Sequence, residues 1–591
     1  MKKFCQAMRL VCFLVAMFGV SVLATVPLYY VYLSSPWLQT WMAELVCLTA
    51  FLMISPAQRI LNRFVALVFP APPIKHLDLG TLPAGEWVTA IAVPAVLADV
   101  STVHEQADAL ERHHLSTNHP NFRYVLLSDF PDSYTPTRES DDLLLEQLAA
   151  RIRQLNAQYA DKGANFYLFH RPRQWAPKQG LWMGWERKRG KLVEFNRFLV
   201  SGCQEGFSVI EGETKVLLGA KYVITLDADT RLSPGAASKL VGAIAHPENR
   251  AVIDPVSETV MTGYGVFQPN MQPRFNREEV TIGQWISLKL TPATANHAVD
   301  ADQGLYGTSA FFGKGIYDVA VFDRTVGRRF PDDLILSHDL LEGCFARCAP
   351  LPDVTLSESV PMSIISEFKR KHRWVRGDWQ SLFWALPFVP THARSWVRNP
   401  LSWLSRWRII DNIRRTCWSP CLLILILVLM YAANPQAIIM VALLVFVAPG
   451  VVEDLQISKG SFTKTIFHFA QVVLRRVYEC VSALIWLPTE AVVVCHAIVT
   501  SITRLAISKR NQLAWVTSDL TEKLTRQGPA SYVGSMAAGP ATGALVLFAY
   551  PSDSSVATVI IAWLWISSPY LAWLLAKRRE MLFVAVGRNN S

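Results

Sequence analysis

The stretch KYVITLDADT, from Lys221 to Thr230, decides the fold that we expect for this chain. Its run of β-branched and aromatic residues predicts a buried strand that leads into two carboxylates. Side chains alternate along a strand, so Asp227 and Asp229 should project to the same side. Paired carboxylates at a strand end can hold a divalent cation that binds a diphosphate. The alternative is that an Asp after a strand only caps the following turn.

Apolar runs alternate with helical stretches around this strand, from about Trp87 to His372. Strands are predicted at Val88–Leu97, at Phe122–Phe130 and over NFYLFHR (Asn165–Arg171). Helices are predicted in the polar stretch between Leu97 and Leu115 and over Asp141–Tyr159. Strands that alternate with helices predict an α/β domain with a mostly parallel sheet. Ligands of such sheets bind at the carboxyl ends of the strands.

The composition predicts a membrane protein. The 591 residues are 51% hydrophobic and include 19 tryptophans, and the mean hydropathy is +0.23. A span needs roughly 20 apolar residues, and we expect about six, at Leu10–Leu33, Trp37–Ile54, Trp418–Ala432, Ala437–Val452, Ser531–Tyr550 and Ala557–Leu575. Basic flanking residues place both termini in the cytoplasm. A cleaved signal peptide is the alternative for the first run, although that run is long and a second span follows at once.

Charges interrupt the apolar segment Phe462–Lys509, which predicts an interfacial or re-entrant segment. The expected domains are a transmembrane hairpin at 1–70, a cytoplasmic catalytic domain at 71–385 and a juxtamembrane region with a second hairpin at 386–460. Interfacial helices with a loop follow at 461–530, and a last hairpin with a tail at 531–591.

Cysteines and net charge exclude two classes of function. Cys344 and Cys348 lie four residues apart, but no second pair completes a zinc site, so the ten cysteines are expected to be free and reduced. The net charge of +10 is explained by basic membrane flanks and a pocket for an anion, and no nucleic-acid partner is expected.

Further polar residues stand where an active site would need them. Asp129 ends the predicted strand LLSDF, where it could meet a base or a ribose. The segment WERKRGKLVEFN (Trp185–Asn196) places Lys191 in a basic stretch, before a helix predicted to end near Asn196. These basic residues could bind a phosphate group, and the alternative is a solvated basic surface. In SHDLLEG (Ser337–Gly343), Asp339 begins a helical turn, either as a cap or as a general base.

These segments, in this order, resemble the nucleotide-sugar glycosyltransferases of the GT-A type. They are most similar to the glycosyltransferase domain of cyclic β-1,2-glucan synthases, glycosyltransferase family 84. The matching stretches are LFHRPRQWAPKQGLWMGWERKRGKL, YVITLDADTRL, FFGKGIYDV, RFPDDLILSHDLLEGCFAR, HRWVRGDWQ and RNPLSWLSRWRIIDNIRR. The resemblance covers most of the chain from about Trp87 onward.

The resemblance implies a GT-A-like cytoplasmic domain and inverting transfer of glucose from UDP-glucose, in a multi-pass protein of the bacterial inner (cytoplasmic) membrane. Asp227 and Asp229 would hold Mg²⁺ or Mn²⁺. Asp339 would be the general base, with His338 in a supporting position. Asp129, Lys191 and Asp227 would bind the donor.

The segment HRWVRGDWQ adds candidates on one predicted helix. Arg373 and Arg376 are three residues apart, so both can face the pyrophosphate of the donor. Trp374 and Trp379 offer flat faces for the acceptor sugar, and Asp378 would orient an arginine or a sugar hydroxyl. The alternative is a juxtamembrane anchor, because Trp and Arg are also enriched at membrane interfaces.

Three departures from the family pattern bear on the product. Other processive synthases have QxxRW, whereas this chain has a cation, Arg370, in place of the Gln. The loop Tyr306–Phe312, which lies near the acceptor in related folds, has Thr308 where a Glu is expected, so this departure bears on the acceptor and the linkage. No segment after Leu575 could supply the family's cyclisation modules. A linear product is therefore expected, with a separate cyclising or exporting partner.

The sequence thus predicts a processive membrane glucosyltransferase that extends a glucan acceptor, with helices in the lipid bilayer that line a route out for the polymer. Two alternatives stay open. One is the transfer of a single sugar to a lipid carrier, and the other is a non-catalytic membrane scaffold of the same fold.

Overall fold

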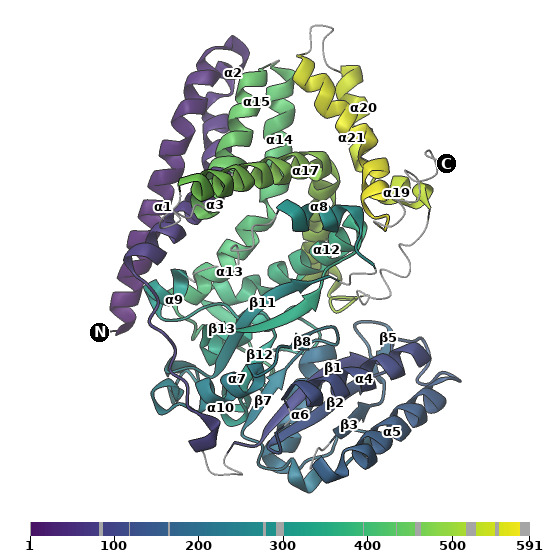
Figure 1. Cartoon of the computed structure of the whole chain (residues 1–591). Coiled ribbons are helices and arrows are strands. Elements are labelled where there is room, and N and C mark those ends of the chain that lie inside the picture. The colour runs from purple at the N-terminus through teal and green to yellow at the C-terminus, as the bar shows by residue number, and fades with distance from the viewer. Residues whose placement is uncertain are drawn as a thin grey trace.

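The computed structural model describes residues 2–81, 87–117, 119–162, 166–275, 279–290, 301–393, 395–432, 434–454, 462–515, 528–549 and 555–578. An α/β domain lies next to a group of long apolar helices, and the N-terminal helix runs along one side of that group (Figure 1).

The main sheet of the described residues has nine strands in the order β6-β3-β2-β1-β7-β12-β11-β13-β8. Their bounds are β1 Thr89–Val96, β2 Phe122–Asp129, β3 Phe166–Arg171, β6 Val209–Glu211, β7 Tyr222–Thr225, β8 Arg231–Leu232, β11 Val266–Arg274, β12 Gly315–Asp318 and β13 Cys348–Ser359. Strands β3, β2, β1 and β7 run parallel to one another, and β11 runs parallel to β13. Strand β12 runs antiparallel between β7 and β11, and the edge strands β6 and β8 are antiparallel to β3 and β13. The carboxyl ends of four adjacent strands therefore meet at one edge.

Helices cover both faces of this sheet. One core combines side chains of β1, β2 and β7 with α4 (Val100–Thr117), α5 (Asp141–Gln158) and α7 (Ala236–Ala245). The alternate side chains of the same strands pack against α6 (Arg187–Ser201), α10 (Val319–Thr325) and α11 (Asp339–Ala346). The predicted α/β fold with a mostly parallel sheet is confirmed, and it is consistent with a GT-A-like domain.

Two local predictions were wrong. Strand β7 ends at Thr225, two residues before Asp227, so a turn and not strand alternation positions Asp227 and Asp229. Helix α6 begins at Arg187 and continues to Ser201, so the basic residues lie inside the helix, which does not end near Asn196. Buried apolar residues up to Leu199 hold its last turns on the sheet.

Six described helices are long and apolar enough to cross a membrane, or seven if a bent pair counts as one span. The elements are α1 (Lys2–Leu33), α3 (Met42–Val68), α13 with α14 (Trp403–Thr416, Trp418–Tyr431), α15 with α16 (Pro435–Ala442, Ala448–Asp454), α17 (Phe462–Thr503) and α21 (Val556–Leu575). The predicted number of about six agrees. The second predicted span was misplaced, because the chain folds there into the short helix α2 (Pro36–Thr40) before α3 begins.

Two regions depart from simple hairpins. The predicted span near Ser531–Tyr550 consists of α19 (Pro529–Ser535) and α20 (Ala538–Ala549), bent by 69°, with Tyr550 outside the described residues. Helix α17 has the length and hydropathy of a span, but its first part runs across the other apolar helices in Figure 1. The interfacial role of Phe462–Lys509 therefore stays a prediction.

Helix α12 (Ile364–Gln380), which carries HRWVRGDWQ, joins the two parts of the molecule. Val375 packs with Val494 and Ala497 of α17, and Lys371 forms an ion pair with Glu490 of the same helix. The shorter elements are β4 (Gln174–Ala176) with β5 (Leu181–Met183), β9 (Val252–Ile253) with β10 (Val260–Thr262), β14 (Phe388–Pro390) with β15 (Trp396–Arg398), α8 (Ile282–Leu290) and α9 (Ala301–Tyr306).

A glycine permits a second junction, between α9 and the end of α3. A Cβ atom at Gly304 would lie 2.1 Å from the backbone oxygen of Phe69. We predict that Gly304→Ala destabilises the protein by about 1–3 kcal/mol through overpacking, which a lower thermal midpoint in detergent would reveal. Gly19→Ala is the matched control, because a Cβ there meets no described atom within 4 Å. Equal midpoints for the two variants would show that this junction does not support the fold.

Candidate active site

A cavity of ≈ 2560 Å³ opens at the carboxyl ends of the strands and continues to the apolar helices. Its wall includes the strand-end residues Asp129, Asp227 and Asp229, and it also includes Asp339 and α12 residues from Lys369 to Asp378. On the side of the apolar helices it is lined by Gln58, Asn62, Trp407, Asp411, Asn412 and His496. All the candidate site residues of the sequence analysis except Trp379 line this cavity.

Asp227 is held between two lysines. Lys188 Nζ of α6 lies 2.5 Å from Asp227 Oδ1, and Lys314 Nζ lies 3.0 Å from Oδ2. Lys188 also donates to the backbone oxygen of Gly313 at 2.9 Å, and Lys314 forms an ion pair with Glu358. Burial alone would raise the pKa of the Asp227 carboxyl, but the two ammonium groups outweigh it and hold the pKa well below its usual value. Asp227 is therefore ionised.

Asp229 lies in the same turn but is exposed, and no described cation forms an ion pair with its carboxylate within 4 Å. Although the residue is exposed, partial desolvation of the carboxyl group by the surrounding protein raises its pKa, and the nearby Asp227 adds to this effect. Carboxylate oxygens are the ligands that Mg²⁺ and Mn²⁺ prefer, and one or two of them with phosphate oxygens are typical for Mg²⁺. The Asp229 carboxylate therefore offers oxygens that fit the expected cation, whereas a cation at Asp227 would have to share its oxygens with Lys188 and Lys314.

Asp339 is the first residue of α11, and its carboxylate rests against Gly313, where a Cβ atom would lie 2.5 Å from Oδ1. His338 Nδ1 lies 3.5 Å from Asp339 Oδ1 and 2.6 Å from Glu342 Oε1. Burial alone would lower the pKa of His338, but the two carboxylates raise it above its usual value. These three side chains could themselves hold a metal ion, with ligand atoms within 4.8 Å of one another. The contact between His338 and Glu342 already accounts for their grouping.

Asp129 and Lys191 are engaged with each other at the edge of the sheet. The register aligns Asp129 of β2 with Arg171 of β3, and the Arg171 guanidinium binds both carboxylate oxygens at 2.8 Å. Lys191 Nζ lies 3.2 Å from Asp129 and donates to the backbone oxygen of Ala95. Burial lowers the pKa of Lys191 to about 8 despite the nearby carboxylate. Their predicted contact with the donor stays a prediction.

The two arginines of α12 have different surroundings. The pKa of Arg373 is lowered by burial, which outweighs the nearby carboxylates of Asp227 and Asp339, and its guanidinium lies 5.4 Å from the ring centre of Trp515. Arg376 donates to the backbone oxygens of Ala514 and Gln512, both at 2.8 Å. Arg373 thus lies within electrostatic range of the two carboxylates, whereas Arg376 holds the segment 511–515 in the wall of the cavity.

The residues predicted to bind the acceptor also differ in their surroundings. Trp374 is 49% exposed in the cavity and stacks on Arg370. Trp379 instead packs near Val375 against α17 and donates to Thr416 Oγ1 at 3.0 Å. Asp378 accepts a hydrogen bond from Asn412 Nδ2 at 3.3 Å, and burial raises its pKa to about 6. The structure therefore brings Trp374 and Asp378, but not Trp379, to the cavity.

Two further side chains, Lys314 and Trp515, contribute to this site and are not among the residues predicted from the sequence. Lys314 lies in FFGKGIYDV, a stretch used only to identify the family, although its position between Gly313 and Gly315 could have indicated a site. Trp515 lies between Arg187 and Arg373, with its ring centre 5.5 and 5.4 Å from their guanidinium carbons. More than 130 residues separate Trp515 from Arg373, so no local pattern could predict this contact.

Comparison with known proteins identifies a relative of this chain. No family model matches the chain. The chain is 33% identical over 513 residues to the cyclic β-(1,2)-glucan synthase NdvB of Rhizobium meliloti (strain 1021). The alignment covers 83% of this chain and 18% of that protein, so the chain spans less than a fifth of the relative that it matches. The resemblance to cyclic glucan synthases that the motifs indicated is confirmed.

The raised pKa of Asp378 predicts a pH-dependent stability. The folded state holds this proton up to about pH 6, whereas the carboxyl ordinarily titrates near 3.8. Ionisation of the buried group therefore destabilises the fold as the pH rises through this window, and the penalty is complete above it. We therefore compare the free energy of unfolding of Asp378→Asn with that of the wild type at pH 7.5 and at pH 4. We predict that this difference favours the variant by about 1–3 kcal/mol more at pH 7.5 than at pH 4. Thermal midpoints at both pH values test this, and a difference that does not change with pH would contradict it.

Proposed function

Because the chain is similar in sequence to a cyclic β-(1,2)-glucan synthase over 83% of its own length, we propose that it is an inverting membrane glucosyltransferase. It transfers glucose from UDP-glucose to a growing β-1,2-glucan and remains bound to the acceptor between transfers. The apolar helices anchor it in the bacterial inner membrane, with the α/β domain in the cytoplasm.

The observation that carries this proposal is that one cavity contains cations suited to a leaving diphosphate and a carboxylate suited to act as a base. Lys188, Lys314 and Arg373 supply positive charge next to the turn with Asp227 and Asp229. These cations would stabilise the negative charge that develops on the leaving UDP. A strand-end site for a diphosphate also agrees with the position of ligands on parallel sheets.

Asp339 is proposed as the general base. The acceptor hydroxyl oxygen attacks the anomeric carbon, the bond from that carbon to the UDP oxygen breaks, and the hydroxyl proton passes to the Asp339 carboxylate. The negative charges of Asp227 and Asp339 both raise the pKa of Lys188, so its ammonium group lies near the donor turn and near the base. This proximity suits a reaction in which departure of UDP and removal of the proton occur together.

Asp227 and Asp229 would hold Mg²⁺ or Mn²⁺. When bound, the cation would offset the charge of the diphosphate and act as a Lewis acid on its oxygens. The lysines at Asp227 contribute to the same neutralisation from the protein side.

The acceptor is proposed to lie in the part of the cavity that reaches the apolar helices. Trp374 offers an exposed aromatic face, and Asp378 and Asn412 offer polar groups beside it. Farther along, Gln58 of α3 donates to Asp411 of α13 at 3.2 Å, and both side chains line the cavity. Polar side chains in apolar helices are expected to face a water-filled path, which suits a hydrophilic polymer.

The proposed base predicts the behaviour of Asp339→Asn. Membranes that contain the protein are supplied with Mg²⁺ and UDP-glucose labelled in the sugar, and the products are sized and digested with a β-1,2-specific glucanase. The wild type should give water-soluble, digestible polymer, and the substitution should lower its rate by about 10²–10⁴-fold.

Asp353→Asn is the matched control, because Asp353 is an exposed carboxylate outside the cavity. Wild-type rates for Asp339→Asn would exclude Asp339 as the base. Label in the lipid fraction would favour transfer of a single sugar to a lipid carrier, and no turnover with any nucleotide sugar would favour the scaffold.

A second prediction concerns the cation. Removal of divalent metal with a chelator should abolish polymer synthesis, and Mg²⁺ or Mn²⁺ should restore it. Asp229→Asn should raise the metal concentration for half-maximal rate by about tenfold or more, because one charged ligand becomes a neutral amide. Full activity in the chelator would mean that the lysines at Asp227 neutralise the diphosphate without metal.

A further inference from the structure

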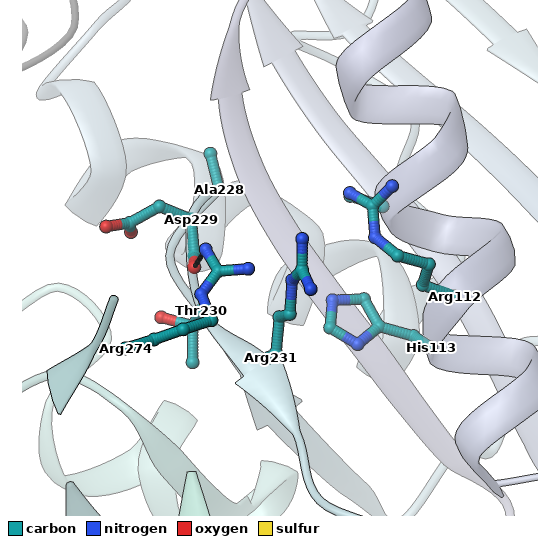
Figure 2. A pocket seen from close by; sticks show the side chains of 8 residues that line it. Arg112, His113, Ala228, Asp229, Thr230, Arg231 and Arg274 are labelled. Atoms are coloured by element: carbon teal, nitrogen blue, oxygen red, sulfur yellow. Dashed lines mark hydrogen bonds between the residues drawn. The ribbon is translucent and has the colours of Figure 1, made fainter. Parts of the chain in front are cut away.

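Three arginines from separate elements gather beside the turn that carries Asp229. Arg112 belongs to α4, Arg231 to β8 and Arg274 to the end of β11, and all three line a small cavity together with His113. Their guanidinium groups face the same space in Figure 2, with the imidazole of His113 next to Arg231. Like charges in such proximity repel one another, so this arrangement favours an anion between them.

The protein itself offers little compensation for these charges. Arg112 and Arg231 have no carboxylate within 4 Å among the described residues. Arg274 donates to two neutral acceptors, the backbone oxygen of Asp229 at 3.2 Å and Ser359 Oγ at 2.8 Å. The Asp229 carboxylate lies on the far side of Arg274 from Arg112 and His113 (Figure 2).

His113 is a second, independent indication of a ligand. Its side chain lines the cavity although the residue is only 3% exposed, and Nε2 has no hydrogen-bond partner in the described part of the chain. Buried polar atoms without a partner are rare because desolvation is unfavourable. An anion oxygen in the cavity would accept a hydrogen bond from this nitrogen.

We infer that Arg112, His113, Arg231 and Arg274 form a binding site for a phosphate-type oxyanion. A guanidinium group presents paired donors that match the oxygens of a phosphate. The cavity measures ≈ 40 Å³, and a water molecule needs roughly 10–15 Å³ on the same scale. The space therefore suits one phosphate group, either a free ion or the terminal group of a larger molecule that extends outward.

The site adjoins the groups proposed for catalysis, because Asp229 lines the small cavity and Arg112, Arg231 and Arg274 also line the large one. Arg274 binds the backbone oxygen of Asp229, so an anion held by Arg274 would contact the turn that bears both Asp227 and Asp229. Binding at this site does not depend on the proposed sugar transfer and can be measured without it.

The test is equilibrium binding of radiolabelled inorganic phosphate to the purified full chain in detergent, at constant ionic strength and with a chelator that removes metal. The double variant Arg112→Gln/Arg231→Gln should bind phosphate at least about tenfold more weakly, because two charge-assisted contacts are lost. His113→Phe, which keeps an aromatic ring without the nitrogen atoms, should also weaken binding. The thermal midpoint without phosphate checks folding, and it should not fall in the double variant because repulsion is relieved.

Two controls locate the effect. Arg197→Gln/Arg324→Gln removes the same charge from a partly exposed and an exposed position outside this cavity, and Lys314→Gln removes a cation beside Asp227. Both should retain wild-type binding. Displacement of phosphate by phenyl phosphate would indicate the terminal group of a larger molecule, whereas failure to displace it would indicate the free ion. The inference is overturned if the wild type shows no saturable binding, if the arginine and histidine variants bind normally, or if Lys314→Gln abolishes binding.

Discussion

The paired contact of Asp227 with Lys188 and Lys314 is the interaction on which the arrangement of the site depends. It joins the turn after β7, the helix α6 and the segment before β12, three elements that lie far apart in the sequence. Lys188 also binds the backbone of Gly313, against which Asp339 rests. One ionised carboxylate thereby fixes the distance between the proposed donor site and the proposed base.

The second constraint is that the α/β domain and the apolar helices share helix α12. One face of α12 packs on α17 through Val375, while Arg373 lines the cavity and Arg376 holds the segment 511–515. From the sequence alone, a membrane anchor and a ligand-binding helix are alternatives for HRWVRGDWQ. The packing against α17 and the position in the cavity wall allow the same helix to serve both purposes.

The charged groups around Asp411 and the arginine cluster beside the Asp229 turn differ in how far the protein itself compensates their charge. In the wall, Asp411 is compensated by Arg414 and Arg415, at 2.7 and 2.5 Å, and by Gln58. In the arginine cluster the charges have one sign and His113 keeps an unpaired nitrogen. The first arrangement is complete within the protein, whereas the second requires a ligand to complete it.

The sequence by itself determined the elements whose signals are local. The strand run before Asp227, the alternation of strands and helices, and most of the long apolar segments were predictable, because periodicity and hydropathy act over a few neighbouring residues. The stretches that resemble cyclic glucan synthases also identified the cavity-lining residues Asp227, Asp339 and Arg373. Only the tertiary structure decided the partners of each side chain. It committed Asp129 to Arg171, turned Trp379 toward Thr416, brought Trp515 to Arg373 and gathered three distant arginines around His113. These contacts join residues far apart in the chain, and their geometry depends on how whole elements pack, which no short stretch of sequence specifies.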